Sequence, residues 1–194
     1  MSFLQIHDLI ERIGNLLRAE ERLTGVAYGL QPVQLHALRY LARCNRYSDT
    51  PAGVTDYLGL TKGTVSQTLL VLQRKGYIDK QPDLIDRRVV HLVVTDQGRN
   101  VLDAIQAGQL FSRALAELTD EQQAGLADNL TELLRLLQKN HGSRSFGVCH
   151  SCRFFQRDST QDYRCGLTHE PLTEDDSGRI CREHEALDGV IKKD

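Results

Sequence analysis

Four of the five cysteines in this 194-residue chain fall in its last quarter. Cys149 and Cys152 are separated by two residues, and Cys165 and Cys181 follow. The two-residue spacing lets both thiolates of a tight turn face one ion, and two further thiolates complete a tetrahedral set. In a reducing compartment such clustering favours a metal over disulfides. We therefore expect these four cysteines to bind a metal, and Cys44, which stands alone, to be a small buried hydrophobe.

The residue types leave two kinds of metal open. Zinc commonly takes four thiolates, and three histidines could each replace one of them: His150, His169 and His184. The segment lacks the second close cysteine pair of a zinc ribbon, and four aromatic residues could shield an iron-sulfur cluster: Phe146, Phe154, Phe155 and Tyr163. A zinc site would stabilise the fold of this short segment, whereas a cluster would make it a sensor of oxygen, redox state or iron.

A second group of residues has the chemistry of DNA reading. Thr61 can cap a helix whose polar face comprises Thr61, Lys62, Thr64, Ser66, Gln67 and Arg74. Short polar side chains near the start of such a helix reach base edges in the major groove, where Gln67 could bond an adenine and Lys62 a phosphate or guanine. Taken alone, the pattern also fits an ordinary solvated helix face.

The residues that follow predict a β-hairpin with a basic tip. Asp86 and Arg88 are expected on the same strand face, where the carboxylate would hold the guanidinium for entry into the minor groove. Arg87, on the other face, would contact phosphate. Residues 61–99 contain seven Lys or Arg and four Asp, a local charge of +3 in a chain whose net charge is -2. The hairpin therefore adds a modest basic patch to the helix.

Hydrophobic periodicity predicts the elements that position these residues. We expect helices over 3–24, 32–44, 51–59 and 61–75, strands near 77–78 and 89–94, and two further helices that begin after Thr95 and Thr119. The fold class is mainly α with a small β-hairpin wing: a winged helix-turn-helix with long N- and C-terminal dimerisation helices. Their leucine stripes predict a homodimer, although they could instead cover the chain's own core.

Composition divides the chain into two parts. Residues 1–140 form the expected DNA-binding and dimerisation domain, residues 141–145 a linker, and residues 146–185 a cysteine-rich metal-binding element. From residue 145 onward there are ten acidic and seven basic side chains, so this element should not extend the DNA surface. No apolar run is long enough for a membrane helix, and the start lacks a secretory signal, so we expect a cytoplasmic protein.

The helix and hairpin together resemble the winged helix of the multiple-antibiotic-resistance repressor (MarR) family over roughly residues 5–140. The matching pieces are Leu60 to Val65, Gly76-Tyr77-Ile78, Asp86-Arg87-Arg88, and Leu92-Val93-Val94-Thr95 followed by Gly98. The resemblance implies an obligate homodimer on a pseudo-palindromic DNA operator, usually released by a small phenolic effector molecule or by cysteine oxidation. Gly63, Gln67 and Val71 depart from the family pattern, which commonly has serine at the first position and often basic residues at the other two.

The cysteine-rich segment is loosely similar to high-potential iron-sulfur proteins in its pieces CHSCRFFQ, RCGLTHEPL and RIC. We therefore expect a homodimeric transcriptional regulator, a repressor, with a zinc or iron-sulfur site. One alternative is a zinc or iron-sulfur protein that uses the helix-turn-helix only as a dimerisation scaffold; another is a zinc-stabilised protein adaptor. An enzyme is disfavoured because no nucleophile, base and orienting group converge and no phosphate-binding glycine loop is present.

Overall fold

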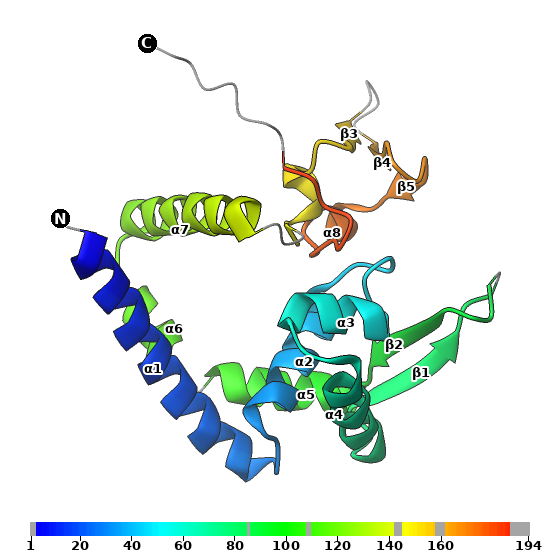
Figure 1. The fold of residues 1–194 in the computed structure, drawn as a ribbon, viewed down its shortest axis with the longest axis horizontal. Coiled ribbons are helices and arrows are strands. Elements are labelled where there is room, and N and C mark those ends of the chain that lie inside the picture. Colours follow the sequence, from blue (N-terminus) through cyan, green and yellow to red (C-terminus); the bar gives the residue numbers. More distant parts are fainter. Residues whose placement is uncertain (1–2, 85, 108–109, 142–144, 158–161, 187–194) are drawn as a thin grey trace.

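The computed structural model describes residues 3–84, 86–107, 110–141, 145–157 and 162–186. Its helices are α1 (Phe3–Ala27), α2 (Pro32–Arg43), α3 (Pro51–Leu58), α4 (Lys62–Arg74), α5 (Asp96–Ala107), α6 (Leu110–Ala116), α7 (Asp120–His141) and α8 (Glu174–Ser177), with one 3₁₀ turn, η1 (Cys149–Ser151). The strands are β1 (Ile78–Pro82), β2 (Val90–Val94), β3 (Phe155–Arg157), β4 (Tyr163–Cys165) and β5 (Pro171–Leu172). The expected fold class, a mainly helical winged helix-turn-helix, is confirmed (Figure 1).

Local capping fixes where the helices of the helix-turn-helix begin. Pro32 and Pro51 occupy the first turns of α2 and α3, where a missing N–H costs no hydrogen bond. Thr50 Oγ1 accepts a hydrogen bond from Gly53 N at 3.1 Å, and Thr61 Oγ1 accepts one from Thr64 N at 3.2 Å. The predicted starts of α3 and α4 are therefore confirmed.

Helix α3 presses closely against the loop that precedes it. The Tyr40 hydroxyl donates a hydrogen bond to the Ser48 carbonyl at 2.8 Å, and a Cβ placed on Gly53 would lie 2.1 Å from that same oxygen. Only glycine fits at such a distance. This contact sets how α3 packs on α2, and α3 in turn packs on α4.

The hairpin is antiparallel, with Ile78 opposite Val94 and Pro82 opposite Val90. Gly76, at φ 72°, turns the chain from α4 into β1. Leu92 N donates a hydrogen bond to the Asp49 carbonyl at 2.7 Å, which ties β2 to the loop before α3. In Figure 1 the hairpin extends beyond the helices, with α4 beside the start of β1.

The main core lies between α2, α3, α4, the hairpin and α5. Its most buried large members are Tyr40, Leu35, Leu38, Leu69, Leu72, Ile78 and Leu92. Ile180, from the C-terminal segment (residues 145–186), belongs to the same core and is only 6 % exposed. The cysteine-rich segment is therefore packed onto the winged helix rather than standing clear of it.

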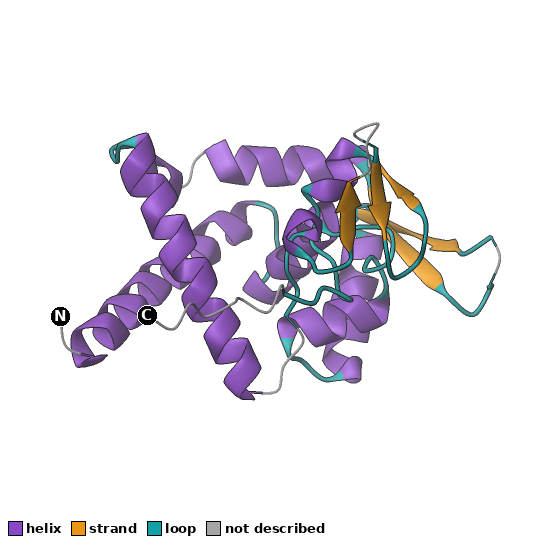
Figure 2. Ribbon diagram, turned by 90° about the horizontal axis from the view of Figure 1, so that it is seen from above, coloured by secondary structure: helices purple, strands orange, loops and turns teal. Residues whose placement is uncertain are grey.

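Helices α1 and α7 lie away from this core, as both ribbon views show (Figures 1 and 2). Thr119 and Gln122 form a capping box at the start of α7, which begins after Thr119 as predicted. The short helix α6 was not among the predicted elements. Large apolar side chains are exposed along α1, α6 and α7: Leu4, Ile6, Leu9, Ile10, Ile13, Leu16, Leu23, Val26, Leu110, Phe111, Leu126, Leu130, Leu134, Leu136 and Leu137.

Within the described ranges, none of the helices has both the length and the apolarity needed to cross a membrane. The linker expected at 141–145 falls mostly outside the described residues, since 142–144 are not described.

Candidate DNA interface and metal centre

The residues predicted to read DNA are exposed on α4. These exposed positions are Thr61, Lys62, Thr64, Ser66, Gln67 and Arg74. The Thr61 hydroxyl also serves as the helix cap and lies 3.0 Å from the Thr64 hydroxyl, so both are oriented by the cap. Arg74 lies about 10 Å along the helix from Gln67, the last residue of the N-terminal cluster, at a rise of about 1.5 Å per residue, so it is separated from that cluster.

At the tip of the wing, Asp86 and Arg88 form the predicted forked ion pair. Arg88 Nε lies 2.9 Å from Asp86 Oδ1, and Arg88 Nη2 lies 2.8 Å from Asp86 Oδ2. The hydrogen bonds from Arg88 lower the pKa of Asp86, and those to Asp86 raise the pKa of Arg88. One expectation was wrong: both residues occupy the turn before β2, not one face of a strand, and the fork forms because the turn folds the side chains together. Arg87 is exposed beside them.

A histidine connects the wing to the helix-turn-helix. His91 Nδ1 lies 2.6 Å from Asp49 Oδ1, and His91 Nε2 lies 3.1 Å from Asp83 Oδ2. The hydrogen bond with Asp49, supported by the one with Asp83, raises the pKa of His91, while burial raises the pKa of Asp49 despite that bond. When protonated, His91 donates to two carboxylates, one before α3 and one in the wing loop. No local sequence pattern indicates this bridge, because its members lie up to 42 positions apart.

All four predicted ligand cysteines line one cavity of about 80 Å³, here called the cysteine cavity. Cys149 and Cys152 come from η1 and its end, Cys165 from the end of β4, and Cys181 from the stretch after α8. Phe154, Phe155, Leu167 and Leu172 supply half of the remaining wall residues. The thiols are thus brought together by a small three-stranded sheet and two turns.

Burial, and after it the neighbouring thiols of Cys181, Cys165 and Cys152 in that order, raises the pKa of Cys149 to about 12. Burial likewise raises the pKa of Cys181. Thiolates crowded into such a place need a cation to balance them. This donor set therefore fits a thiophilic metal or metal cluster.

None of the three candidate histidines lines the cysteine cavity. The His184 ring is buried and lies within hydrogen-bond distance of Ser145 Oγ, at 2.8 Å, and of Ser151 Oγ, at 3.0 Å. His150 Nδ1 lies 3.0 Å from the Ser177 carbonyl. The described histidines therefore do not replace a cysteine in this arrangement.

The aromatic shell differs in part from the expectation. Phe154 and Phe155 line the cavity, and the Tyr163 ring packs on Phe155 at 5.1 Å between centroids. Phe146 instead packs edge-on against Tyr57, at 5.2 Å, where it belongs to the winged-helix core. Its place in a shield was wrong because its ring packs on Tyr57 and Tyr40 instead of lining the cavity.

Two wall residues of the cysteine cavity, Asn45 and Tyr47, come from the loop between α2 and α3. Tyr47 donates a hydrogen bond to Glu170, and Arg46 Nη2 lies 2.9 Å from the same carboxylate. The Tyr47 bond lowers the pKa of Glu170. The sequence carries no local signal for these contacts, which join positions more than 120 residues apart.

The C-terminal segment also reaches α3 directly. Arg182 Nη2 lies 2.7 Å from Asp56 Oδ2, and the Arg182 backbone N–H donates to Ser48 Oγ at 2.8 Å. Because Arg182 follows Cys181, one cavity residue is joined to the helix that packs against α4.

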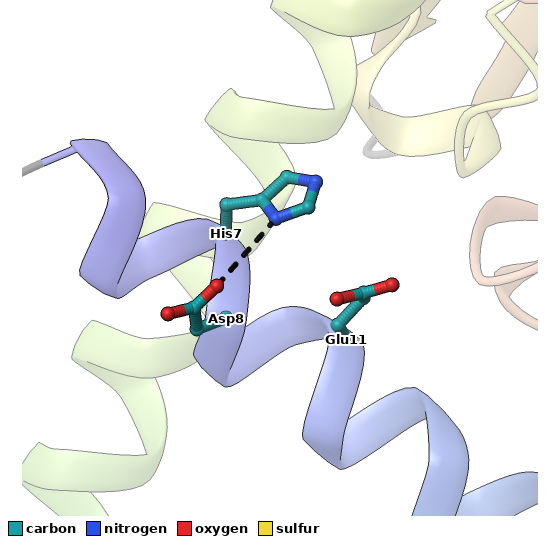
Figure 3. Close-up of side chains that lie close together, drawn as sticks. All are labelled: His7, Asp8 and Glu11. Atoms are coloured by element: carbon teal, nitrogen blue, oxygen red, sulfur yellow. Dashed lines mark ion pairs between the residues drawn. The ribbon is translucent and has the colours of Figure 1, made fainter.

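A different cluster of metal-binding residue types lies on α1, where His7, Asp8 and Glu11 share one face (Figure 3). All three are exposed, and His7 Nδ1 lies 4.0 Å from Asp8 Oδ1. Exposed groups of this kind are common without an ion, so we assign them no role.

Comparison with known proteins supports the reading of the fold. Residues 28–89 match the model of the MarR family. No curated protein matches the chain at a significant level. A MarR transcriptional regulator from Methanosarcina mazei Go1 is 20 % identical, with a TM-score of 0.58, and the match covers 69 % of this chain and 96 % of that one.

Two further solved structures show the same fold. FabT from Streptococcus pneumoniae, solved in complex with DNA, is 25 % identical with a TM-score of 0.55, over 71 % of this chain and 99 % of FabT. CouR from Rhodococcus jostii RHA1, bound to p-coumaroyl-CoA, is 20 % identical with a TM-score of 0.55, over 66 % of this chain and 90 % of CouR. The family match over residues 28–89 and the shared fold together support a winged helix of the MarR type in this chain.

Proposed function

We propose that this protein is a homodimeric, DNA-binding transcriptional repressor of the MarR type. The observation that carries the proposal is the pairing of an exposed polar N-terminal face on α4 with an arginine held ready on the wing. Arg88 is 89 % exposed, yet Asp86 fixes its direction through both oxygens. A preset guanidinium of this kind suits the narrow and strongly negative minor groove.

The DNA complex of FabT, which shares this fold, supports duplex DNA as the ligand. In this reading α4 enters the major groove, with Lys62, Thr64 and Gln67 towards the bases, while the wing reaches the adjacent minor groove. The CoA-thioester complex of CouR supports a small-molecule effector for this kind of fold.

The homodimer is proposed from the exposed apolar side chains of α1, α6 and α7. Ile10, Ile13 and Leu16 follow one another along α1, and each is at least 45 % exposed. A contiguous apolar surface of this kind is costly in water and indicates a partner. A second copy related by a two-fold axis would cover this surface, and a pseudo-palindromic operator has the same two-fold symmetry. Sedimentation should give a dimer, and Ile13→Glu should dissociate it.

The cysteine cavity is proposed as a metal site, because four thiols converge there from separate elements. The alternative function is a zinc or iron-sulfur protein whose helix-turn-helix serves only for dimerisation. Asp86 and Arg88 argue against this alternative, since a dimerisation scaffold has no use for an exposed, fixed arginine.

Selection of genomic fragments by the purified protein tests the proposal. The selected duplex should bind with an affinity that falls steeply as salt rises, because phosphate contacts release counterions. Gln67→Ala should lower the specific affinity by about 1–3 kcal/mol. Gln73→Ala, an exposed glutamine at the far end of the same helix, is the control and should bind as the original protein does. Failure to enrich any fragment would favour the scaffold alternative.

A further inference from the structure

The sulfur atoms of the cysteine cavity are spread too widely for a single zinc ion. Among the described residues, no three of the four sulfurs lie within 4.8 Å of one another. Zinc bonds of about 2.3 Å in a tetrahedron place four thiolate sulfurs about 3.8 Å apart, nearly in contact. A four-iron cluster holds its cysteine sulfurs further apart, because the iron and sulfide ions lie between them.

The space between the sulfurs leads to the same conclusion. A four-thiolate zinc site encloses no cavity, whereas about 80 Å³ lies inside this one. Water is a poor occupant, since it needs two to four polar partners and the exposed surface of the wall is almost entirely apolar, with Phe154, Phe155, Leu167 and Leu172 among its residues. A cluster that carries its own sulfides fills the volume and accepts an apolar wall.

One hydrogen bond at the cavity is directed at a ligand sulfur. The Glu185 backbone N–H donates to Cys152 Sγ at 3.4 Å. Hydrogen bonds to cysteine sulfurs are a main means by which a protein stabilises and tunes an iron-sulfur cluster. The backbone of residues 184–186 is held there by a bridge between Cys152 and Ala186.

The same cavity is built partly from the DNA-binding part of the chain. Asn45 and Tyr47 close one side. Cys181 lies between Ile180, which is in the winged-helix core, and Arg182, which forms an ion pair with Asp56 of α3. An occupant that fixes Cys181 therefore also fixes the next residue, Arg182, which is the ion-pair partner of Asp56. Because α3 packs on α4, the position of α4, which carries the predicted DNA-reading residues, also depends on Cys181.

We propose that the cysteine cavity holds a four-iron, four-sulfide cluster and that its presence raises the affinity of the winged helix for DNA. The second half of this statement rests on the proposed function; the first half does not. The ligands are Cys149, Cys152, Cys165 and Cys181. The cluster fixes the position of Cys181 and thereby the contact of Arg182 with α3. Without the cluster, the loop that carries Asn45 and Tyr47 loses the group against which it packs.

Metal and acid-labile sulfide analysis of the full chain, purified without oxygen, tests the first half. We expect brown protein with about four irons and four sulfides per chain. Cys165→Ser should lose most of the iron. Cys44→Ala removes the one cysteine outside the cavity and should keep it, which controls for the loss of a buried thiol. About one zinc per chain, about two irons, or no metal in the original protein would each overturn the assignment.

DNA binding of the loaded protein and of the same preparation stripped by an iron chelator tests the second half. We expect stripping to weaken binding to the selected duplex at least about tenfold. Arg182→Gln should keep its iron and lose part of the affinity. Arg153→Gln breaks a comparable ion pair, to Glu185, that does not reach α3, and should keep both. Equal affinity of the loaded and the stripped protein for the duplex would refute the proposal that the cluster raises DNA affinity. If neither form binds any genomic duplex, the proposed function fails, while the iron and sulfide content still decides the cluster.

Discussion

Ile180 and Cys44 lie side by side as a parallel β-bridge that joins the cysteine-rich segment to the end of α2. Ile180 N donates to the Arg43 carbonyl at 2.9 Å, and Asn45 N donates to the Ile180 carbonyl at 2.9 Å. Both residues are buried in the winged-helix core. The cysteine-rich segment and the winged helix therefore share backbone hydrogen bonds as well as side-chain contacts.

Shortening Ile180 should loosen this junction. Ile180→Ala removes buried methyl groups from a core position and should lower the free energy of unfolding by about 2–4 kcal/mol. Denaturant unfolding measures the loss, and limited proteolysis should show faster cleavage of the C-terminal segment. Leu84→Ala is the control, since Leu84 is 98 % exposed and its truncation should change stability by less than about 0.5 kcal/mol. Equal stability of the Ile180 variant and the original would contradict the shared core.

Arg88→Ala should weaken operator binding about tenfold or more without changing the thermal midpoint, because Arg88 is exposed in the free protein. Arg88→Lys keeps the charge but not the fork with Asp86, and should give an intermediate affinity. Fluorescence anisotropy with the selected duplex measures both. Arg164→Ala, which removes an exposed arginine from the C-terminal segment, is the matched control. The wing has no part in binding if Arg88→Ala and Arg164→Ala behave alike.

Gly53→Ala should destabilise the helix-turn-helix by about 1–3 kcal/mol, because the new methyl group would lie 2.1 Å from the Ser48 carbonyl and 2.9 Å from the Tyr40 hydroxyl. Thermal and denaturant unfolding check this value. Gly63→Ala is the contrasting substitution: its nearest neighbour would be Thr61 Oγ1 at 3.9 Å, and alanine favours a helix. A neutral result for Gly53→Ala would mean that α3 does not approach the loop so closely.

The bridge made by His91 predicts a pH dependence of stability. The folded-state pKa of His91 is raised, chiefly by Asp49 and then by Asp83. Its contribution is therefore complete below the ordinary histidine pKa of about 6.5 and is lost as pH rises through the raised value. The stability difference between the original protein and His91→Asn, up to about 1 kcal/mol, should shrink over that window. A difference that grows with pH would show the opposite sign of the shift.

Local features of the sequence predicted much of the fold. The caps at Thr61 and Thr119 involve neighbours three residues away, and the structure confirms both of them. The fork between Asp86 and Arg88 was predicted for the same reason, although the turn that makes it was not. Sequence spacing likewise identified the four cysteines that line a common cavity.

Contacts between distant parts of the chain were not predictable in this way. Nothing near Tyr47 indicates that it meets Glu170, and nothing near Phe146 indicates that it packs on Tyr57. The choice between zinc and a cluster also depends on sulfur separation and cavity volume, which ligand spacing along the chain does not contain. Helix α6 was not predicted because its seven residues, LFSRALA, are too few to show a clear periodicity.

Hydroxyl-radical footprinting of the selected duplex tests the DNA-binding account most directly. A dimer that places one α4 in each of two major grooves should protect two segments about 10 base pairs apart on one face of the duplex, flanked by minor-groove protection from the wings. Arg88→Ala should remove the flanking protection alone. A duplex that shows no protection, or a single protected segment without two-fold symmetry, would contradict the account.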